Sequence, residues 1–292
     1  MHSNQNNFYK QFLVSVLLIW GGLSSAMAAE PVAMVTDLSG KVVLAGDARK
    51  PALSILSDIR QDAKIQLDKG AHAVVVYLKS GQEYELNGPA VVQFGSSQPD
   101  SISGAKPQLH GAALTKGGKE VRIKPVVVAQ AAIVMRSIKH TSKIKLLNLS
   151  DTRTLEDHPA FSWQAPQPGL HYSFKLLDDV GKILFESKVE KSSLELPQQI
   201  QMKDSADYTW VVSASSPDGT EFSNAGDFGV ASAELRKKVE SLRPASDATL
   251  SERVAFSAWL EQMNLRDEAR KYWKSISAER PDDKRLKVLA GE

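Results

Sequence analysis

The chain has 292 residues, a formal net charge of +2 and no cysteine. Its length predicts two or three modules rather than a single hydrophobic core. The lack of cysteine excludes disulfides, thiolate metal sites and a cysteine nucleophile, so core burial must stabilise the fold.

The first 28 residues are typical of a secretory signal peptide. Lys10 precedes an apolar run over 12–23, and Ala26-Met27-Ala28 forms an A-x-A site for cleavage between Ala28 and Ala29. The run is shorter than the length of about 20 residues that spans a bilayer. The alternative interpretation, an uncleaved membrane anchor, stays open. Either reading places the rest of the chain outside the cytoplasm, periplasmic or otherwise secreted. We therefore expect no nucleic-acid partner, and a membrane partner only if the signal is retained.

Residues 29–94 predict a small all-β domain. The residues of 71–78, AHAVVVYL, form an apolar strand with core faces on both sides. Turns are expected at Gly81 and at Asn87-Gly88-Pro89, because glycine adopts positive φ at little cost. Short strands at this spacing predict a sandwich, a roll or a solenoid-like sheet.

This domain resembles the FecR-like domain. The residues that carry the resemblance are Gly40-x-Val42, Ile59-Arg60-Gln61-Asp62, 71–78, Ser80-Gly81 and Tyr84-x-Leu86. Gln61 stands where the family usually has glycine, which predicts a differently built turn. The resemblance implies an extracytoplasmic domain used for interaction or signalling. The iron-signalling members carry a cytoplasmic anti-sigma segment, and the few residues before the apolar run argue against that role here.

Residues 95–120 are rich in glycine, serine and proline, which predicts a flexible linker or an excursion between strands. The β-prone residues that follow leave open an extension of the first domain to residue 140. This region also contains a basic stretch beside an acidic module, which is a candidate interaction surface or simply a set of solvated strand faces. Its members are Arg122, Lys124, Arg136, Lys139, Lys143 and Lys145.

Residues 142–230 predict a second all-β domain of about seven strands, an immunoglobulin-like sandwich. The stretch is similar to fibronectin type III domains through Met202, Tyr208, Trp210 and Val212. The resemblance makes Tyr208 the corner tyrosine, with its hydroxyl bonded to the upstream backbone, and Trp163 a core tryptophan. Core packing is the favoured interpretation of both side chains over ligand stacking.

The apolar period changes to that of helices over 231–292. Thr249-x-x-Glu252 is a capping box, and Asn264 is suited to the left-handed end of that helix. Two of these helices resemble one tetratricopeptide unit through Ala269, Trp273 and Pro281. One unit cannot bury both faces, so the helices pack on the sandwich or present aromatic side chains to a partner. The candidate docking residues are Trp259, Tyr272 and Trp273.

The sequence contains no H-E-x-x-H, G-x-S-x-G, complete phosphate-loop or EF-hand motif. We therefore expect a mainly β protein that is not an enzyme and has no cofactor, metal or catalytic residues. Its expected function is that of an exported envelope protein, a non-catalytic interaction or scaffold module for other envelope proteins. The alternatives left open are a peptidoglycan or polysaccharide binder, a FecR-type extracytoplasmic regulator and a hydrolase with a triad assembled from distant loops.

Overall fold

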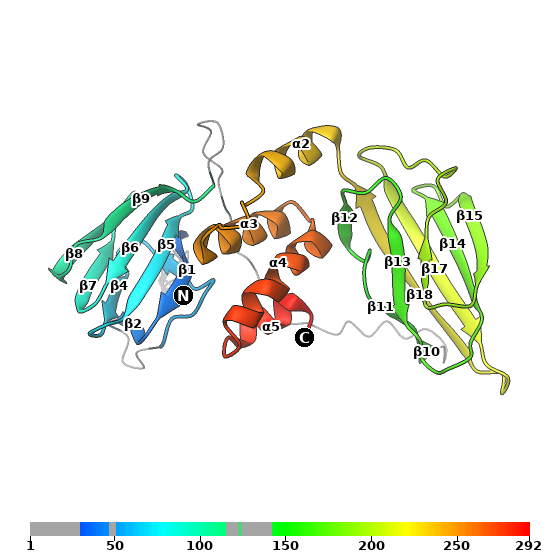
Figure 1. The fold of residues 1–292 in the computed structure, drawn as a ribbon, viewed down its shortest axis with the longest axis horizontal. Coiled ribbons are helices and arrows are strands. Elements are labelled where there is room, and N and C mark those ends of the chain that lie inside the picture. The colour runs from blue at the N-terminus through cyan, green and yellow to red at the C-terminus, as the bar shows by residue number, and fades with distance from the viewer. Residues whose placement is uncertain (1–29, 47–50, 115–122, 124–141) are drawn as a thin grey trace, which may run out of the picture. The chain divides into compact units, whose positions relative to one another are not determined.

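The computed structural model describes residues 30–46, 51–114, 123 and 142–292. Over these ranges the protein is mainly β, and helices follow the last strand (Figure 1). The predicted fold class, two all-β modules with a C-terminal helical tail, is confirmed. No helix in the described ranges is long and apolar enough to cross a bilayer. The predicted signal peptide, with Ala28 and Ala29 at its cleavage point, lies outside them.

The first module contains two antiparallel sheets. One has the strand order β3-β1-β5-β6-β9 and the other β2-β4-β7-β8. The strands are β1 (Pro31–Ser39), β2 (Val42–Ala45), β3 (Asp58–Arg60), β4 (Lys64–Leu67), β5 (His72–Tyr77), β6 (Gln82–Asn87), β7 (Ala90–Phe94), β8 (Pro99–Gly104) and β9 (Gln108–Ala112). In the turn between β3 and β4, Asp62 adopts a φ of 63°, a left-handed conformation that aspartate tolerates better than most residues.

Strand β5 is apolar on both faces, as its sequence predicts. Ala73 and Val75 belong to a core cluster with members from both sheets of the module. Val76, at the end of the strand, and Leu78, just after it, belong instead to a second cluster that contains the C-terminal helices. The two faces of one strand therefore serve two different cores, and this alternation couples the first module to the helical tail.

The prediction of a flexible linker over 95–120 is wrong for much of that stretch. Strand β8 pairs with β7, and β9 pairs with β6, so each sheet of the first module gains an edge strand. Composition alone suggested a loop because these strands are rich in small and polar residues. Their backbone groups nevertheless find partners in neighbouring strands, and that pairing determines the structure.

The second module is a sandwich of a larger and a smaller sheet. The larger has the order β10-β18-β17-β14-β15, with β12 also paired to β18, and the smaller β11-β13-β16. The strands are β10 (Ser142–Lys143), β11 (Lys145–Leu146), β12 (Thr152–Thr154), β13 (Ala160–Gln164), β14 (Tyr172–Asp178), β15 (Ile183–Val189), β16 (Ser193–Glu195), β17 (Asp207–Ser215) and β18 (Glu221–Val230). Alternating burial along β14 and β17 places their aromatic side chains in one core.

Two sequence predictions in the sandwich are confirmed. The Tyr208 hydroxyl accepts a hydrogen bond of 2.8 Å from the backbone N–H of Lys203, five residues upstream. Trp163 is 1% exposed and lies 5.2 Å, centroid to centroid, from Tyr172. Both side chains therefore stabilise the sandwich and are not platforms for a ligand.

The tail contains α2 (Ala233–Leu242), α3 (Leu250–Gln262), α4 (Arg266–Glu279) and α5 (Lys284–Ala290). The capping box at Thr249 and Glu252 forms with both of its hydrogen bonds. Asn264 has a φ of 59°, which confirms the left-handed end of α3.

The expected packing of this tail on the sandwich is only part of the arrangement. Its apolar faces share a core cluster with the first module, through Met34, Ile55 and Leu56 as well as Val76 and Leu78. Met34 on β1 and Val76 on β5 make one face of the first module's larger sheet apolar, which explains why the helices cover it.

Candidate functional site

The three aromatic residues predicted to dock a partner do not form an exposed surface. Trp259 and Trp273 are 1% and 0% exposed and lie in the core cluster of the helices. Tyr272 is half-buried and packs edge-on against Phe256 at 5.1 Å between ring centroids. The docking prediction is therefore wrong for the tryptophans. Helices α3 and α4 bury them in a core that also contains residues of the first module.

The predicted basic stretch is only partly described by the structure. Lys143 and Lys145 are exposed on β10 and β11. The other four members, Arg122, Lys124, Arg136 and Lys139, lie outside the described residues. A basic interaction surface made by all six residues therefore remains a prediction.

Two histidines converge on one carboxylate of the first module. The Nε2 atoms of His110 and His72 lie 2.8 and 3.4 Å from the two carboxyl oxygens of Glu85. A hydrogen bond from Asn87, together with the two histidines, holds the pKa of Glu85 below its usual range despite some burial. In the part of the chain that the structure describes, no group of three histidine, cysteine or acidic residues is placed to hold a metal ion.

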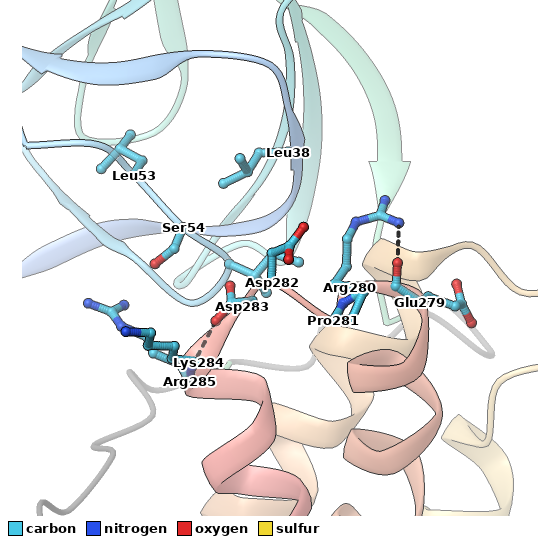
Figure 2. Close-up of a pocket in the computed structure, with 11 residues that line it drawn as sticks. Leu38, Leu53, Ser54, Glu279, Arg280, Pro281, Asp282, Asp283, Lys284 and Arg285 are labelled. Carbon is cyan, nitrogen blue, oxygen red and sulfur yellow. Dashed lines mark hydrogen bonds between the residues drawn. The ribbon is translucent and has the colours of Figure 1, made fainter.

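A cleft of about 490 Å³ lies between the first module and the corner from α4 to α5 (Figure 2). One wall comes from the end of β1 and from the loop between β2 and β3, and the other from the helical corner. Clefts of about 300–1,000 Å³ are the usual size of sites that bind drug-sized ligands. The lining residues are Leu38, Leu53, Ser54, Ile55, Glu279, Arg280, Pro281, Asp282, Asp283, Lys284 and Arg285.

Residues 53–56 of the β2–β3 loop are held in place because they contribute to two cores. Leu53 packs against the core of the first module, whereas Ile55 and Leu56 belong to the core shared with the helices. Leu56 adopts a φ of 64°, an unfavourable backbone conformation for a branched side chain. A hydrogen bond of 2.8 Å from its N–H to the Val35 carbonyl holds it there. The Leu53 side of the cleft is therefore a preformed wall.

The helical corner is fixed by its own turn chemistry. Pro281 follows the end of α4 and has no N–H with which to continue the helix. Asp283 then caps α5, because its side chain accepts hydrogen bonds from the backbone N–H groups of Arg285 and Leu286. Leu286 is 0% exposed and anchors α5 in the core. This places Asp282, Lys284 and Arg285 at the surface of the cleft.

An ion pair joins the two walls. The Arg280 guanidinium donates a hydrogen bond of 2.9 Å to the carboxylate of Asp37 on β1. Glu279 is occupied by a second pair, because both of its carboxylate oxygens accept from Arg253 at 2.6 and 2.8 Å. Arg280 and Glu279 are therefore committed to structure, and they contribute little free charge to a ligand.

Three charged side chains of the cleft, Asp282, Lys284 and Arg285, form no hydrogen bond or ion pair in the described part of the chain, although the charge of Arg285 also acts on Asp58. The side chains of Asp282 and Lys284 are exposed and make no hydrogen bond or ion pair within the described part of the chain. Arg285 acts on Asp58, whose pKa is raised by burial and lowered in part by the charges of Arg285 and Arg60. In Figure 2 the side chains of Lys284 and Arg285 extend on the Ser54 side, and Asp282 points toward Leu38.

No sequence motif predicts this cleft. Its two walls come from segments more than two hundred positions apart along the chain, and neither contains a recognisable motif. The one local signal was Pro281 followed by four charged residues, which marks a helix end with a polar turn. The cleft combines an apolar wall with two cations and one carboxylate that form no hydrogen bond within the described part of the chain. These groups are suited to binding a ligand that has both apolar and polar parts.

Comparisons with known proteins identify no family for this chain. No family model matches it, and no match is found among curated proteins. Three solved structures show weak likeness: CopC from Methylosinus trichosporium OB3b (16% identity, 31% of this chain and 95% of that one, TM-score 0.24), PorZ of the type-IX secretion system of Porphyromonas gingivalis (14%, 56% and 22%, 0.21) and a β-1,2-glucanase from Parabacteroides distasonis (10%, 86% and 48%, 0.23). With TM-scores this low, they carry no argument about this protein.

Proposed function

We propose that this chain is an exported, non-catalytic scaffold of the bacterial envelope, and that the cleft beside Leu53 is where it holds a partner protein. The observation that carries the proposal is the Arg280–Asp37 ion pair across the cleft, at 2.9 Å. It joins two preformed walls, and a preformed cavity binds with a smaller entropic cost than a flexible one. The FecR-like resemblance of the first module supports the same role, since it implies an interaction domain outside the cytoplasm.

Contacts between the helical tail and the sandwich support the scaffold interpretation. The backbone N–H of Leu149 donates to the Asp267 carboxylate at 2.7 Å, and the N–H of Arg153 donates to the Asn264 carbonyl at 2.6 Å. Thr152 accepts a hydrogen bond from the N–H of Arg266 at 3.0 Å. These backbone contacts fix the tail to the second module as well as to the first. A protein held together in this way is suited to presenting surfaces.

The experiment is in-cell photocrosslinking in the native host. A benzophenone amino acid replaces Ser54, a residue of the cleft lining on the first module, and in a matched strain it replaces Lys287, an exposed residue of α5 outside the lining. We expect a discrete protein adduct from position 54 and none from position 287. Equal adducts from both positions, or no protein adduct from position 54, would overturn the proposal. Co-sedimentation of the chain with purified cell wall, without a protein adduct, would establish the polymer-binding alternative instead.

A further inference from the structure

The chemistry of the cleft also indicates what kind of segment it holds. Its Ser54 side carries the free cations Lys284 and Arg285, and its wall opposite the helical corner is apolar at Leu38 and Leu53. Both leucines are only half-buried, so they offer apolar surface that is still in contact with water. A ligand that covers this wall and neutralises the cations gains from both the hydrophobic effect and charge-assisted hydrogen bonds.

The carboxylate of Asp282 limits the chemical classes of ligand that fit the cleft. Asp282 points to the Leu38 side and has acceptor oxygens only, so a ligand that contacts it favourably presents an N–H or another donor. A peptide backbone supplies N–H groups beside its side chains, whereas a fatty acid does not. The described lining contains no aromatic side chain, so it has no flat ring on which a sugar could stack.

We infer that the cleft binds a short peptide segment of a partner protein in which an apolar side chain is followed closely by a carboxylate. The apolar side chain lies against Leu38 and Leu53, the carboxylate meets Lys284 and Arg285, and a backbone N–H of the segment donates to Asp282. This inference rests on the proposed scaffold function and specifies the partner chemistry of the same site.

The test uses the protein purified after export with its own leader. Acetylated tetrapeptide amides are titrated into it, and chemical shifts of the Lys284 and Arg285 amides are followed by NMR. The probes are Ala-Leu-Ala-Asp, Ala-Leu-Ala-Lys and Ala-Ser-Ala-Asp. We expect saturable shifts with the first peptide and an affinity about tenfold weaker for each of the others, because each lacks one of the two contacts.

Charge reversal provides the matched protein variants. The double variant K284E/R285E should prefer Ala-Leu-Ala-Lys over Ala-Leu-Ala-Asp, whereas K287E on the same helix should behave as the wild type. Equal binding of the acidic and basic peptides, or no binding of Ala-Leu-Ala-Asp, overturns the inference. A purified muropeptide that binds at these amides more tightly than the tetrapeptide assigns the site to cell wall and also overturns it.

The outcomes separate this inference from the proposed function. A partner that crosslinks from position 54 through a segment without an acidic residue leaves the scaffold function standing and removes the inference. Selective binding of Ala-Leu-Ala-Asp without any protein adduct in cells supports the inference and contradicts the proposed function. The chemistry of the cleft would then be correct and the scaffold function wrong.

Discussion

Ser251 and Glu83 are joined by a buried hydrogen bond of 2.6 Å, although they are 168 positions apart in the sequence. Ser251 lies in the first turn of α3, and Glu83 lies on β6 of the first module. The Ser251 hydroxyl also lies 2.7 Å from the Thr36 hydroxyl, which donates to the Val74 carbonyl at 3.2 Å. This chain of polar groups crosses the junction between the helices and the sheet.

The direction of the hydrogens in this chain depends on the protonation of Glu83. A protonated Glu83 donates to Ser251, which donates to Thr36, which donates to Val74, so that every contact has a hydrogen. An ionised Glu83 takes the Ser251 hydrogen, and the one Thr36 hydrogen then serves either Ser251 or Val74. Burial raises the pKa of Glu83, Glu252 and Glu85 raise it further, and Ser251 and His110 lower it. The protonated form therefore suits the folded protein better.

Replacing Glu83 with glutamine should change how stability depends on pH. A carboxyl whose pKa is raised by folding contributes its stability below its unfolded pKa and loses it as pH rises. Glutamine donates its amide hydrogen at every pH. The free energy of unfolding of E83Q, relative to that of the wild type, should therefore increase by about 1 kcal/mol from pH 4 to pH 7. Urea unfolding across this range measures the difference in free energy.

Glu85 on the same strand provides the control with the opposite sign. Its pKa is lowered, chiefly by the hydrogen bond from Asn87, so its contribution is present at neutral pH and lost as pH falls. E85Q should therefore lose stability relative to the wild type at pH 7 and recover at pH 4. If the free energies of unfolding of E83Q and E85Q both depend on pH as that of the wild type does, the protonation of Glu83 does not affect the stability of this chain of polar groups.

Gly226 on β18 should tolerate no side chain. A Cβ at this position would lie 2.7 Å from Nε1 of Trp210 and 3.0 Å from the carbonyl oxygen of Leu149. Nε1 of Trp210 donates a hydrogen bond of 2.7 Å to this carbonyl. Gly226→Ala should lower the free energy of unfolding by about 2–4 kcal/mol, through overpacking and loss of a buried hydrogen bond. Tryptophan fluorescence during urea unfolding reports it.

Gly229 on the same strand is the matched control for Gly226. A Cβ there first meets the side-chain carboxylate of Asp207 at 2.8 Å, and this end of the side chain can move aside. Gly229→Ala should therefore cost clearly less than Gly226→Ala. Equal costs for the two variants would mean that the contact between Trp210 and Leu149 is not what requires glycine.

Asp267 in the first turn of α4 should control local opening where the sandwich meets the tail. Its carboxylate accepts from the N–H of Leu149 at 2.7 Å and from Arg270 at 2.7 Å. Asp267→Ala should speed hydrogen exchange at the Leu149 amide about tenfold or more, since it removes a charge-assisted acceptor. Glu268→Ala removes an ion pair with the exposed Lys271 that does not involve Leu149, and should leave this amide unchanged. Unchanged exchange in Asp267→Ala would contradict the role of Asp267.

Trp273 should act as a core residue of the tail. It is 0% exposed, and Trp273→Ala should lower the free energy of unfolding by about 3–5 kcal/mol while the purified protein keeps its affinity for a partner. Tyr272→Ala, at a half-buried position, should cost less. Thermal unfolding and a binding titration measure the two effects, and loss of binding at unchanged stability would restore the docking interpretation.

Sequence reasoning succeeded where a local pattern carries the structure. The two-faced strand over 71–78, the capping box at Thr249 and the corner at Tyr208 each follow from side-chain chemistry within a few residues. It failed over 99–112, because strand pairing supplied partners that composition does not reveal. It also missed the cleft, since Leu53 and Arg285 come together only through the tertiary fold.

We propose that the basic side of the cleft holds a partner protein in the cell. The direct measurement compares photocrosslinking from position 54 in the otherwise unaltered chain with that in chains carrying K284E/R285E or K287E. The account predicts a partner adduct in the unaltered and K287E chains, and its loss in K284E/R285E at equal protein level. An adduct of undiminished yield in K284E/R285E, or none in any of the three chains, would contradict it.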